Sequence, residues 1–245
     1  MLVQFMLKNV LSFKEETILD LTAINAYKEH QCNLIDYGTK EKYLRVAAIY
    51  GANASGKSNI YMAMTYFQRI IVESLNNVED GEATAIKTYY QPFSFDSEEE
   101  NSEFQIVQIL GDYEYKYGFE YNSNCIVTEW LYRKNLQTKR TSTIFERTTE
   151  KVEFGSSVRK ECDVYEEQIP VETLVLTFFN KLKMKSNIFK VVYAGVMDTL
   201  VVPTNFCEDT RLLEAFLPQL IDQEKSVLVD FLSAIDTGIR DIEYD

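Results

Sequence analysis

Cysteine, histidine and proline are scarce in this sequence of 245 residues, which has four cysteines, four prolines and one histidine. None of the cysteines forms a Cys-x-x-Cys pair, so a zinc site is not expected, and the thiols are expected to be reduced and buried. Long apolar runs are also missing, since no window approaches the roughly 18 uncharged residues of a membrane span. The N-terminus lacks the basic start and apolar run of a signal peptide. These absences predict a cytoplasmic protein without a membrane span.

Positive charge is the next deficit: 25 Lys and Arg residues stand against 38 Asp and Glu residues, and the formal net charge is −13. A chain this acidic, taken whole, is a poor nonspecific binder of nucleic acid. Aromatic residues, in contrast, make up 13% of the chain and hydrophobic residues 46%. This composition argues against disorder over most of the length and can form one large domain or two small ones.

Short apolar runs and period-two alternation predict a β-rich first half. Tyr and Phe occupy every second position of 113–121, after the two-residue turn signal Gly111-Asp112. Such an aromatic stripe can stack bases, but it more often forms the face of a sheet that packs on a core. The expected strands are a pair at 2–8 and 17–23, a buried strand at 45–50, and an antiparallel sheet from 104–110, 113–121, 125–133, 142–147 and 150–154.

Helical periodicity appears directly after residue 58 and again in the last third of the chain. The first helix is predicted from an apolar stripe at spacings of three and four, formed by Ile60, Met64, Phe67, Ile71 and Leu75. Further helices are expected at 173–185 and at 208–235, the latter broken by Pro218. The segments 25–44 and 155–172 are expected to be mainly loop. The predicted domains are therefore a β-rich part, 1–160, and a mainly helical part, 161–245.

The phosphate-binding pattern Gly-x4-Gly-Lys-Ser occurs between the predicted buried strand and the first predicted helix, which is the context that this pattern requires. Its glycines allow the backbone to wrap closely around phosphate with the N–H groups pointing inward. The N-terminus of the following helix adds a positive dipole end. The sequence of this P-loop is Gly51-Ala52-Asn53-Ala54-Ser55-Gly56-Lys57-Ser58.

The chemistry of the P-loop predicts ATP and Mg²⁺ as cofactors. The Lys57 ammonium is expected to meet the β- and γ-phosphates and to act in catalysis, and the Ser58 hydroxyl is expected to coordinate Mg²⁺. The predicted nucleotide-binding residues are Gly51, Ala52, Asn53, Ala54, Ser55, Gly56, Lys57, Ser58 and Asn59.

The extended pattern Gly-x-Asn-x-Ser-Gly-Lys-Ser-Asn, which includes Asn53 and Asn59, resembles the P-loop of ABC-type ATPases in the SMC, RecF and OLD group. The upstream segment 7–13 (LKNVLSF) resembles the opening strand and turn of that group. The Tyr-rich hairpin and the segment 126–131 (IVTEWL) are similar to bacterial ATPases of abortive infection, Septu and retron defence. The resemblance covers about residues 1–150.

This resemblance implies an α/β fold: the N-terminal lobe of an ABC-ATPase head, a P-loop NTPase with an antiparallel β subdomain followed by helices. In that group two heads sandwich two ATP molecules, and each head has a Walker B Asp-Glu pair, an LSGG-like signature and a switch histidine. None of these is evident here. The nearest Walker B candidate, 227–230 (VLVD), continues with Phe231 in place of the general-base Glu, so Asp230 is expected on a helix surface. The chain therefore resembles the N-terminal part of a longer ATPase or a natural half.

The same family has a Q-loop, whose glutamine senses the metal and the γ-phosphate. Gln91, in the segment Tyr90-Gln91-Pro92-Phe93, precedes a predicted strand at a suitable distance from the P-loop. The resemblance thus implies Gln91 as a second metal-site residue. The alternative is that Gln91 is a loop residue without a role at the metal.

The function that this sequence predicts is an ATPase head that switches a partner, such as a nuclease or a DNA-directed effector, by ATP-dependent dimerisation. The family implies a homodimer of the full-length protein, possible DNA contact and a role in anti-phage defence. An alternative is a non-catalytic module in which ATP stabilises an assembly. A GTPase is less favoured, because the segment 180–183 (NKLK) lacks the Asp of the guanine-reading motif. A small-molecule kinase has no identifiable lid or acceptor site.

Overall fold

The computed structural model describes residues 1–24, 26, 30–75, 84–95, 100–199, 225–227, 229–230, 233 and 240–243. The chain divides into two compact units, Met1–Leu200 and Val201–Asp245. Among the residues described, no helix has both the length and the apolar character that crossing a membrane demands. The site and its supports all lie in the first unit.

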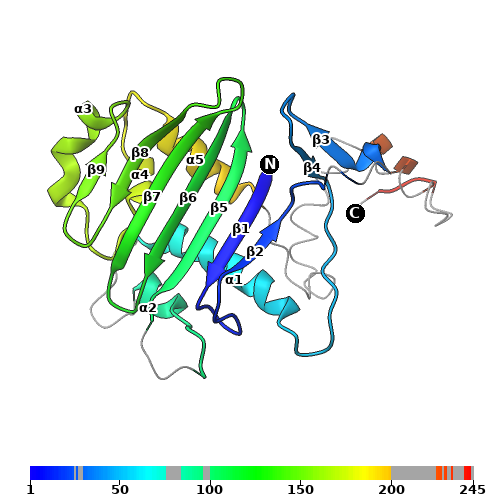
Figure 1. The fold of residues 1–245 in the computed structure, drawn as a ribbon, viewed down its shortest axis with the longest axis horizontal. Coiled ribbons are helices and arrows are strands. Elements are labelled where there is room, and N and C mark those ends of the chain that lie inside the picture. The colour runs from blue at the N-terminus through cyan, green and yellow to red at the C-terminus, as the bar shows by residue number, and fades with distance from the viewer. Residues whose placement is uncertain are drawn as a thin grey trace. The chain divides into compact units, whose positions relative to one another are not determined.

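A large antiparallel sheet forms the centre of the first unit (Figure 1). Its strand order is β2-β1-β5-β6-β7-β8-β9, and every neighbouring pair is antiparallel. The prediction of an antiparallel sheet in this region is confirmed, and β1 matches its predicted range. The strands are β1 (Leu2–Lys8), β2 (Thr17–Asp20), β5 (Ser102–Leu110), β6 (Tyr113–Tyr121), β7 (Ile126–Asn135), β8 (Thr141–Arg147) and β9 (Val152–Phe154).

Helices cover one face of this sheet. Figure 1 shows α1, α4 and α5 behind the strands, and apolar side chains of all three join the strands in one core. The predicted helix after the P-loop is confirmed as α1, although Ile60 and Met64 of its predicted stripe are only half-buried. The helices are α1 (Lys57–Glu73), α2 (Ala85–Tyr89), α3 (Arg159–Cys162), α4 (Val175–Lys181) and α5 (Ile188–Met197), with 3-10 turns η1 (Gln31–Asn33) and η2 (Asp163–Gln168).

The aromatic stripe of β6 faces the covered side of the sheet. Tyr115, Tyr117, Phe119 and Tyr121 are all buried, and they belong to the main core. Their alternation reflects one buried sheet face, as period-two patterning predicts. The expectation that the stripe packs on a core is therefore confirmed, and these rings have no open surface on which a base could stack.

The apolar segment before the P-loop contradicts its prediction. Residues 45–50 form no strand, and Val46 and Tyr50 are 78% and 90% exposed. A buried strand needs hydrogen-bonding neighbours on both edges and cover on both faces. No strand of either described sheet pairs with this segment. The prediction of a buried strand at 45–50 is therefore wrong, because apolar composition alone does not supply those neighbours.

Several boundaries also differ from the predictions. The segment 25–44, expected to be loop with some helix, contains η1 and the hairpin of β3 (Leu34–Asp36) and β4 (Lys42–Leu44). The expected loop 155–172 contains α3 and η2, while α2 and α5 were not expected. The unit boundary lies after Leu200, later than the predicted residue 160, because α4 and α5 share the core of the sheet. Most of the predicted helix 208–235 lies outside the described residues.

A buried carboxylate fastens α4 to the sheet. Glu129 of β7 accepts hydrogen bonds from the backbone N–H groups of Val175 (2.7 Å) and Leu176 (3.1 Å) and from the Tyr117 hydroxyl (3.0 Å). The buried Arg147 guanidinium lies 3.9 Å from the same carboxylate. Burial raises the pKa of Glu129 to about 7, although Arg147 and the backbone donors act to lower it.

This raised pKa predicts a pH-dependent stability. A carboxyl group whose pKa rises from 4.5 to about 7 on folding contributes its full stabilisation below pH 4.5. The contribution is lost as the pH rises through about 7, and it amounts to no more than about 3 kcal/mol. Urea unfolding at pH 4.5 to 8 should therefore show a decline in the free energy of unfolding that Glu129→Gln lacks, since the amide does not titrate. Identical pH slopes in the two proteins would contradict this assignment.

Candidate phosphate-binding site

The P-loop connects the extended segment 45–50 to the start of α1. Residues 51–55 are exposed to solvent, and α1 then runs for 17 residues from Lys57. The first N–H groups of a helix have no partners within it, and they carry the positive end of the helix dipole. The loop therefore presents backbone donors at a surface that an anion can reach.

Backbone conformation explains where the pattern needs glycine. Gly56 lies directly before α1 and has a φ of 90°. Residues other than glycine rarely adopt such a φ. Ala54 also has a positive φ, 62°. A Cβ atom on Gly51 would lie 2.5 Å from the Ser55 Oγ, which is closer than van der Waals contact allows. A larger residue at 56 would thus strain the turn that curls the loop, while one at 51 would force the Ser55 hydroxyl to rotate away.

The Lys57 side chain lies back across this loop. Its Nζ atom donates to the carbonyl oxygens of Gly51 (2.8 Å) and Ala52 (2.5 Å), and it is 3.4 Å from the Ser55 Oγ. The ammonium group is therefore held against the loop by its own backbone, and no acidic side chain among the described residues pairs with it. A lysine held in this way supplies positive charge where a phosphate group would meet the loop.

The other predicted residues take different positions. Ser58 lies exposed in the first turn of α1, next to Lys57, and Asn53 is exposed on the loop. The side chain of Asn59 donates to the Ser12 Oγ atom at 2.8 Å. Its predicted contact with nucleotide stays a prediction. Sequence reasoning missed Ser12 as a neighbour of the P-loop, since 47 positions separate the two residues in the chain.

Gln91 lies on an exposed segment after α2. Its backbone carbonyl accepts a hydrogen bond from the Leu11 N–H at 2.8 Å, and the adjacent Ser12 contacts the P-loop helix. The fold therefore ties the chain at Gln91 to the P-loop through one short turn. Its predicted role at the metal stays a prediction. In the described part of the chain no three His, Cys, Asp or Glu side chains gather in one place, whereas Mg²⁺ at a P-loop is held mainly by phosphate oxygens and waters with few protein ligands.

The predicted Walker B candidate behaves as a helix residue. Asp230 is helical and exposed, as expected. Phe231 and most of the surrounding segment lie outside the described residues. The described part of this segment thus offers no buried strand end at which a carboxylate would face the P-loop.

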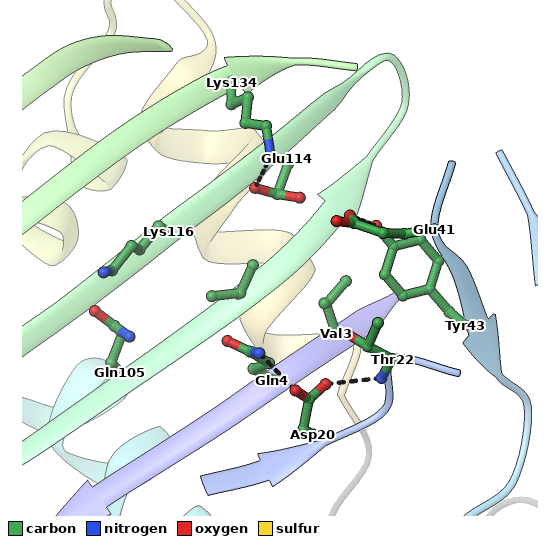
Figure 2. Close-up of a pocket in the computed structure, with 11 residues that line it drawn as sticks. Val3, Gln4, Asp20, Thr22, Glu41, Tyr43, Gln105, Glu114, Lys116 and Lys134 are labelled. Carbon is green, nitrogen blue, oxygen red and sulfur yellow. Dashed lines mark hydrogen bonds and ion pairs between the residues drawn. The ribbon is translucent and has the colours of Figure 1, made fainter. Parts of the chain in front are cut away.

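A separate cavity of about 420 Å³ lies on the face of the sheet opposite α1, α4 and α5, beside Tyr43 of β4 (Figure 2). The polar groups around it are largely paired with each other: Lys134 with Glu114 at 3.1 Å, and Asp20 with the Gln4 amide at 2.8 Å and the Thr22 N–H at 2.7 Å. No P-loop residue lines this cavity. It is therefore distinct from the phosphate-binding candidate, which is an open loop.

The residues of the P-loop fit a bound triphosphate and its metal. The backbone N–H groups from Gly56 onward and the Lys57 ammonium would hold phosphate oxygens, and the Ser58 hydroxyl would coordinate Mg²⁺. The fit rests on the curl of the loop, in which Gly56 has a positive φ and the Lys57 Nζ lies against two loop carbonyls.

Comparison with known families agrees with this geometry. Residues 46–164 match the model of a family described as an AAA domain, putative AbiEii toxin, Type IV TA system. The match starts just before the P-loop and ends after β9, so it includes α1 and most of the sheet. It supports a P-loop ATPase of the AAA or ABC type, which binds ATP and generally uses Mg²⁺. No curated protein matches the chain.

The geometry of Gly56 predicts the effect of a single added methyl group. Gly56→Ala would strain a φ of 90° and place Cβ 2.9 Å from the Ser12 Oγ and 3.3 Å from the Phe13 ring. We expect a loss of roughly 1–2 kcal/mol of stability from the backbone alone and a fall in ATP affinity of about tenfold or more, because the loop is displaced.

Gly38→Ala is the matched control. Gly38 also has a positive φ, 71°, but an added Cβ would meet nothing within 4 Å. It should lower the melting temperature to a similar extent and leave ATP affinity unchanged. Calorimetric ATP titrations that gave equal affinities for the two variants would show that Gly56 has no special place in the site.

Proposed function

We propose that the chain is the ATP-binding part of an ABC-type ATPase head of the SMC, RecF and OLD group. The observation that carries this proposal is the Lys57 ammonium, held at 2.8 Å and 2.5 Å from two loop carbonyls at the N-terminus of α1. The segment 7–13, which carries the resemblance to the opening strand and turn of that group, forms the end of β1 and a turn against this helix. The family match supports the ATPase class alone.

In the proposed site each residue has one task. Lys57 binds and orients the β- and γ-phosphates, and the backbone from Gly56 to Ser58 donates to phosphate oxygens. The Ser58 hydroxyl and, as the family resemblance implies, the Gln91 side chain would hold Mg²⁺, whose charge would neutralise that of the phosphates. These residues bind and position, and none of them is a base that could deprotonate a water molecule.

The wider biological role that we propose is a switch. ATP would join two copies of the full-length protein and thereby control a nuclease or another effector, with possible DNA contact, in cytoplasmic anti-phage defence. The family description, which names a putative toxin of a toxin–antitoxin system, supports a role in abortive infection.

A second candidate is a module in which ATP binding stabilises an assembly without turnover. The exposed, helical position of Asp230 favours it, since a Walker B aspartate lies at the buried end of a strand beside the P-loop. Both candidates predict the same binding site. They differ in whether the full-length protein hydrolyses ATP.

We therefore expect this chain to bind ATP but hardly to hydrolyse it. In calorimetry Lys57→Ala should lose about 1.5–3 kcal/mol of ATP-binding free energy, the contribution of a hydrogen bond to a charged group. GTP should compete poorly. Phosphate release should stay far below about 1 s⁻¹, the low end for enzymes, because the general base and the opposing signature loop are each commonly worth about 10²-fold or more.

The measurement separates the possibilities cleanly. Unchanged ATP affinity in Lys57→Ala would remove the proposed function. Turnover near about 1 s⁻¹ that disappears in Lys57→Ala would show a complete active site in this chain, and it would exclude the assembly module.

A further inference from the structure

The turn between β1 and β2 has an unusual backbone. Within this turn, residues 9–13, Val10 and Phe13 exchange both of their backbone hydrogen bonds at 2.9 Å, which closes a two-residue loop. Leu11 in that loop has a φ of 55°, and Asn9 before it has a φ of 50°. Non-glycine residues with positive φ persist where surrounding contacts hold them.

One side of the turn is fixed to the segment that carries Gln91. The buried Asn9 accepts from the Phe93 N–H at 2.9 Å and donates to the Glu100 carbonyl at 2.7 Å. The Leu11 N–H donates to the Gln91 carbonyl at 2.8 Å. These bonds hold the backbone at Gln91, Phe93 and Glu100 against the turn. A shift of the turn would therefore also move the backbone at Gln91.

The other side of the turn touches the P-loop. The Ser12 Oγ accepts a hydrogen bond from the Asn59 side chain at 2.8 Å, and Ser12 and Phe13 lie so close to Gly56 that a Cβ atom there would meet both. Successive helix residues point about 100° apart. Asn59, which follows Ser58 by one position, therefore directs its side chain to the turn while Lys57 lies across the loop.

We propose that the Asn59–Ser12 hydrogen bond sets the position of the P-loop relative to Gln91. Ser12 and Asn59 are then positioning residues for the binding of Mg·ATP. The turn is the only described element with hydrogen bonds to both Asn59 and the Gln91 backbone. This inference rests on the proposed function and refines it, since Asn59 then acts through Ser12 and not by touching nucleotide. The hydrogen bond to Ser12 also explains why residue 59 is an asparagine, although phosphate binding alone does not require one there.

A double-mutant cycle tests the inference on the full 245-residue chain. Ser12→Ala, Asn59→Ala and the double variant are titrated with ATP by calorimetry, in Mg²⁺ and in EDTA. We expect each single variant to raise the Kd in Mg²⁺ by about three- to tenfold, the scale of one net hydrogen bond. The double variant should match the singles to within about twofold, because one shared interaction is lost only once. The increase in Kd should be smaller in EDTA, because the hydrogen bond positions the P-loop and the Gln91 segment, which are proposed to hold Mg²⁺ between them.

Controls separate positioning from general destabilisation. Ser157→Ala removes the hydroxyl of an exposed serine in the same unit and should leave the Kd and its Mg²⁺ dependence unchanged. Thermal melts establish that each variant is folded. Ser12 and Asn59 are not buried, so these truncations leave no core cavity.

Three results would decide against the proposal. If Asn59→Ala weakens ATP binding by the same factor in the unmodified chain and in the Ser12→Ala background, then Asn59 contacts nucleotide directly. Equal losses in Mg²⁺ and EDTA, or no loss in either single variant, would remove the positioning role. These outcomes differ from failure of the proposed function, in which the unmodified chain itself would not bind ATP.

Discussion

The site depends on one aromatic contact, that of Phe67 in α1 with the sheet. Phe67 stacks on Phe119 of β6, with ring centroids 5.6 Å apart and planes 8° from parallel, and it makes edge contacts with Phe5 of β1 and Phe104 of β5. Aromatic pairs at these separations are favourable beyond their buried area. Because the three partners come from three strands, this side chain anchors the middle of α1 against the sheet, and the P-loop lies at the N-terminus of that helix.

Polar groups hold the opposite end of α1. The Thr177 hydroxyl donates to the Ile71 carbonyl at 2.6 Å, and the Thr173 hydroxyl donates to the Ser74 carbonyl at 2.8 Å, so the last turn of α1 is bound to α4 and the residues before it. Glu129 in turn binds the first N–H groups of α4. A chain of buried hydrogen bonds thus runs from β7 through α4 to α1, and the helix that presents the P-loop is held at its middle by packing and at its end by polar contacts.

The sequence predicts what repeats locally and misses what depends on distant partners. The period-two aromatics of 113–121 and the apolar stripe of α1 were predictable, since each pattern directly reflects one buried face. The run 45–50 failed because apolar composition indicates burial but not the neighbours that provide it. Ser12 beside Asn59, and Glu129 beneath α4, are pairings across 47 and 46 positions, and no local pattern encodes them. The P-loop residues themselves could be predicted because their chemistry fixes both residue type and spacing, and their contacts with nucleotide stay predictions.

The most direct test of this account is amide hydrogen exchange with and without Mg·ATP. The P-loop is proposed to bind the triphosphate, and the turn 9–13 to support the P-loop through Ser12. We therefore expect slower exchange on addition of Mg·ATP in peptides covering 51–59 and, to a smaller degree, 9–13, with no change in β8. Unchanged exchange across 51–59 at saturating Mg·ATP, or protection confined to another part of the chain, would contradict this account.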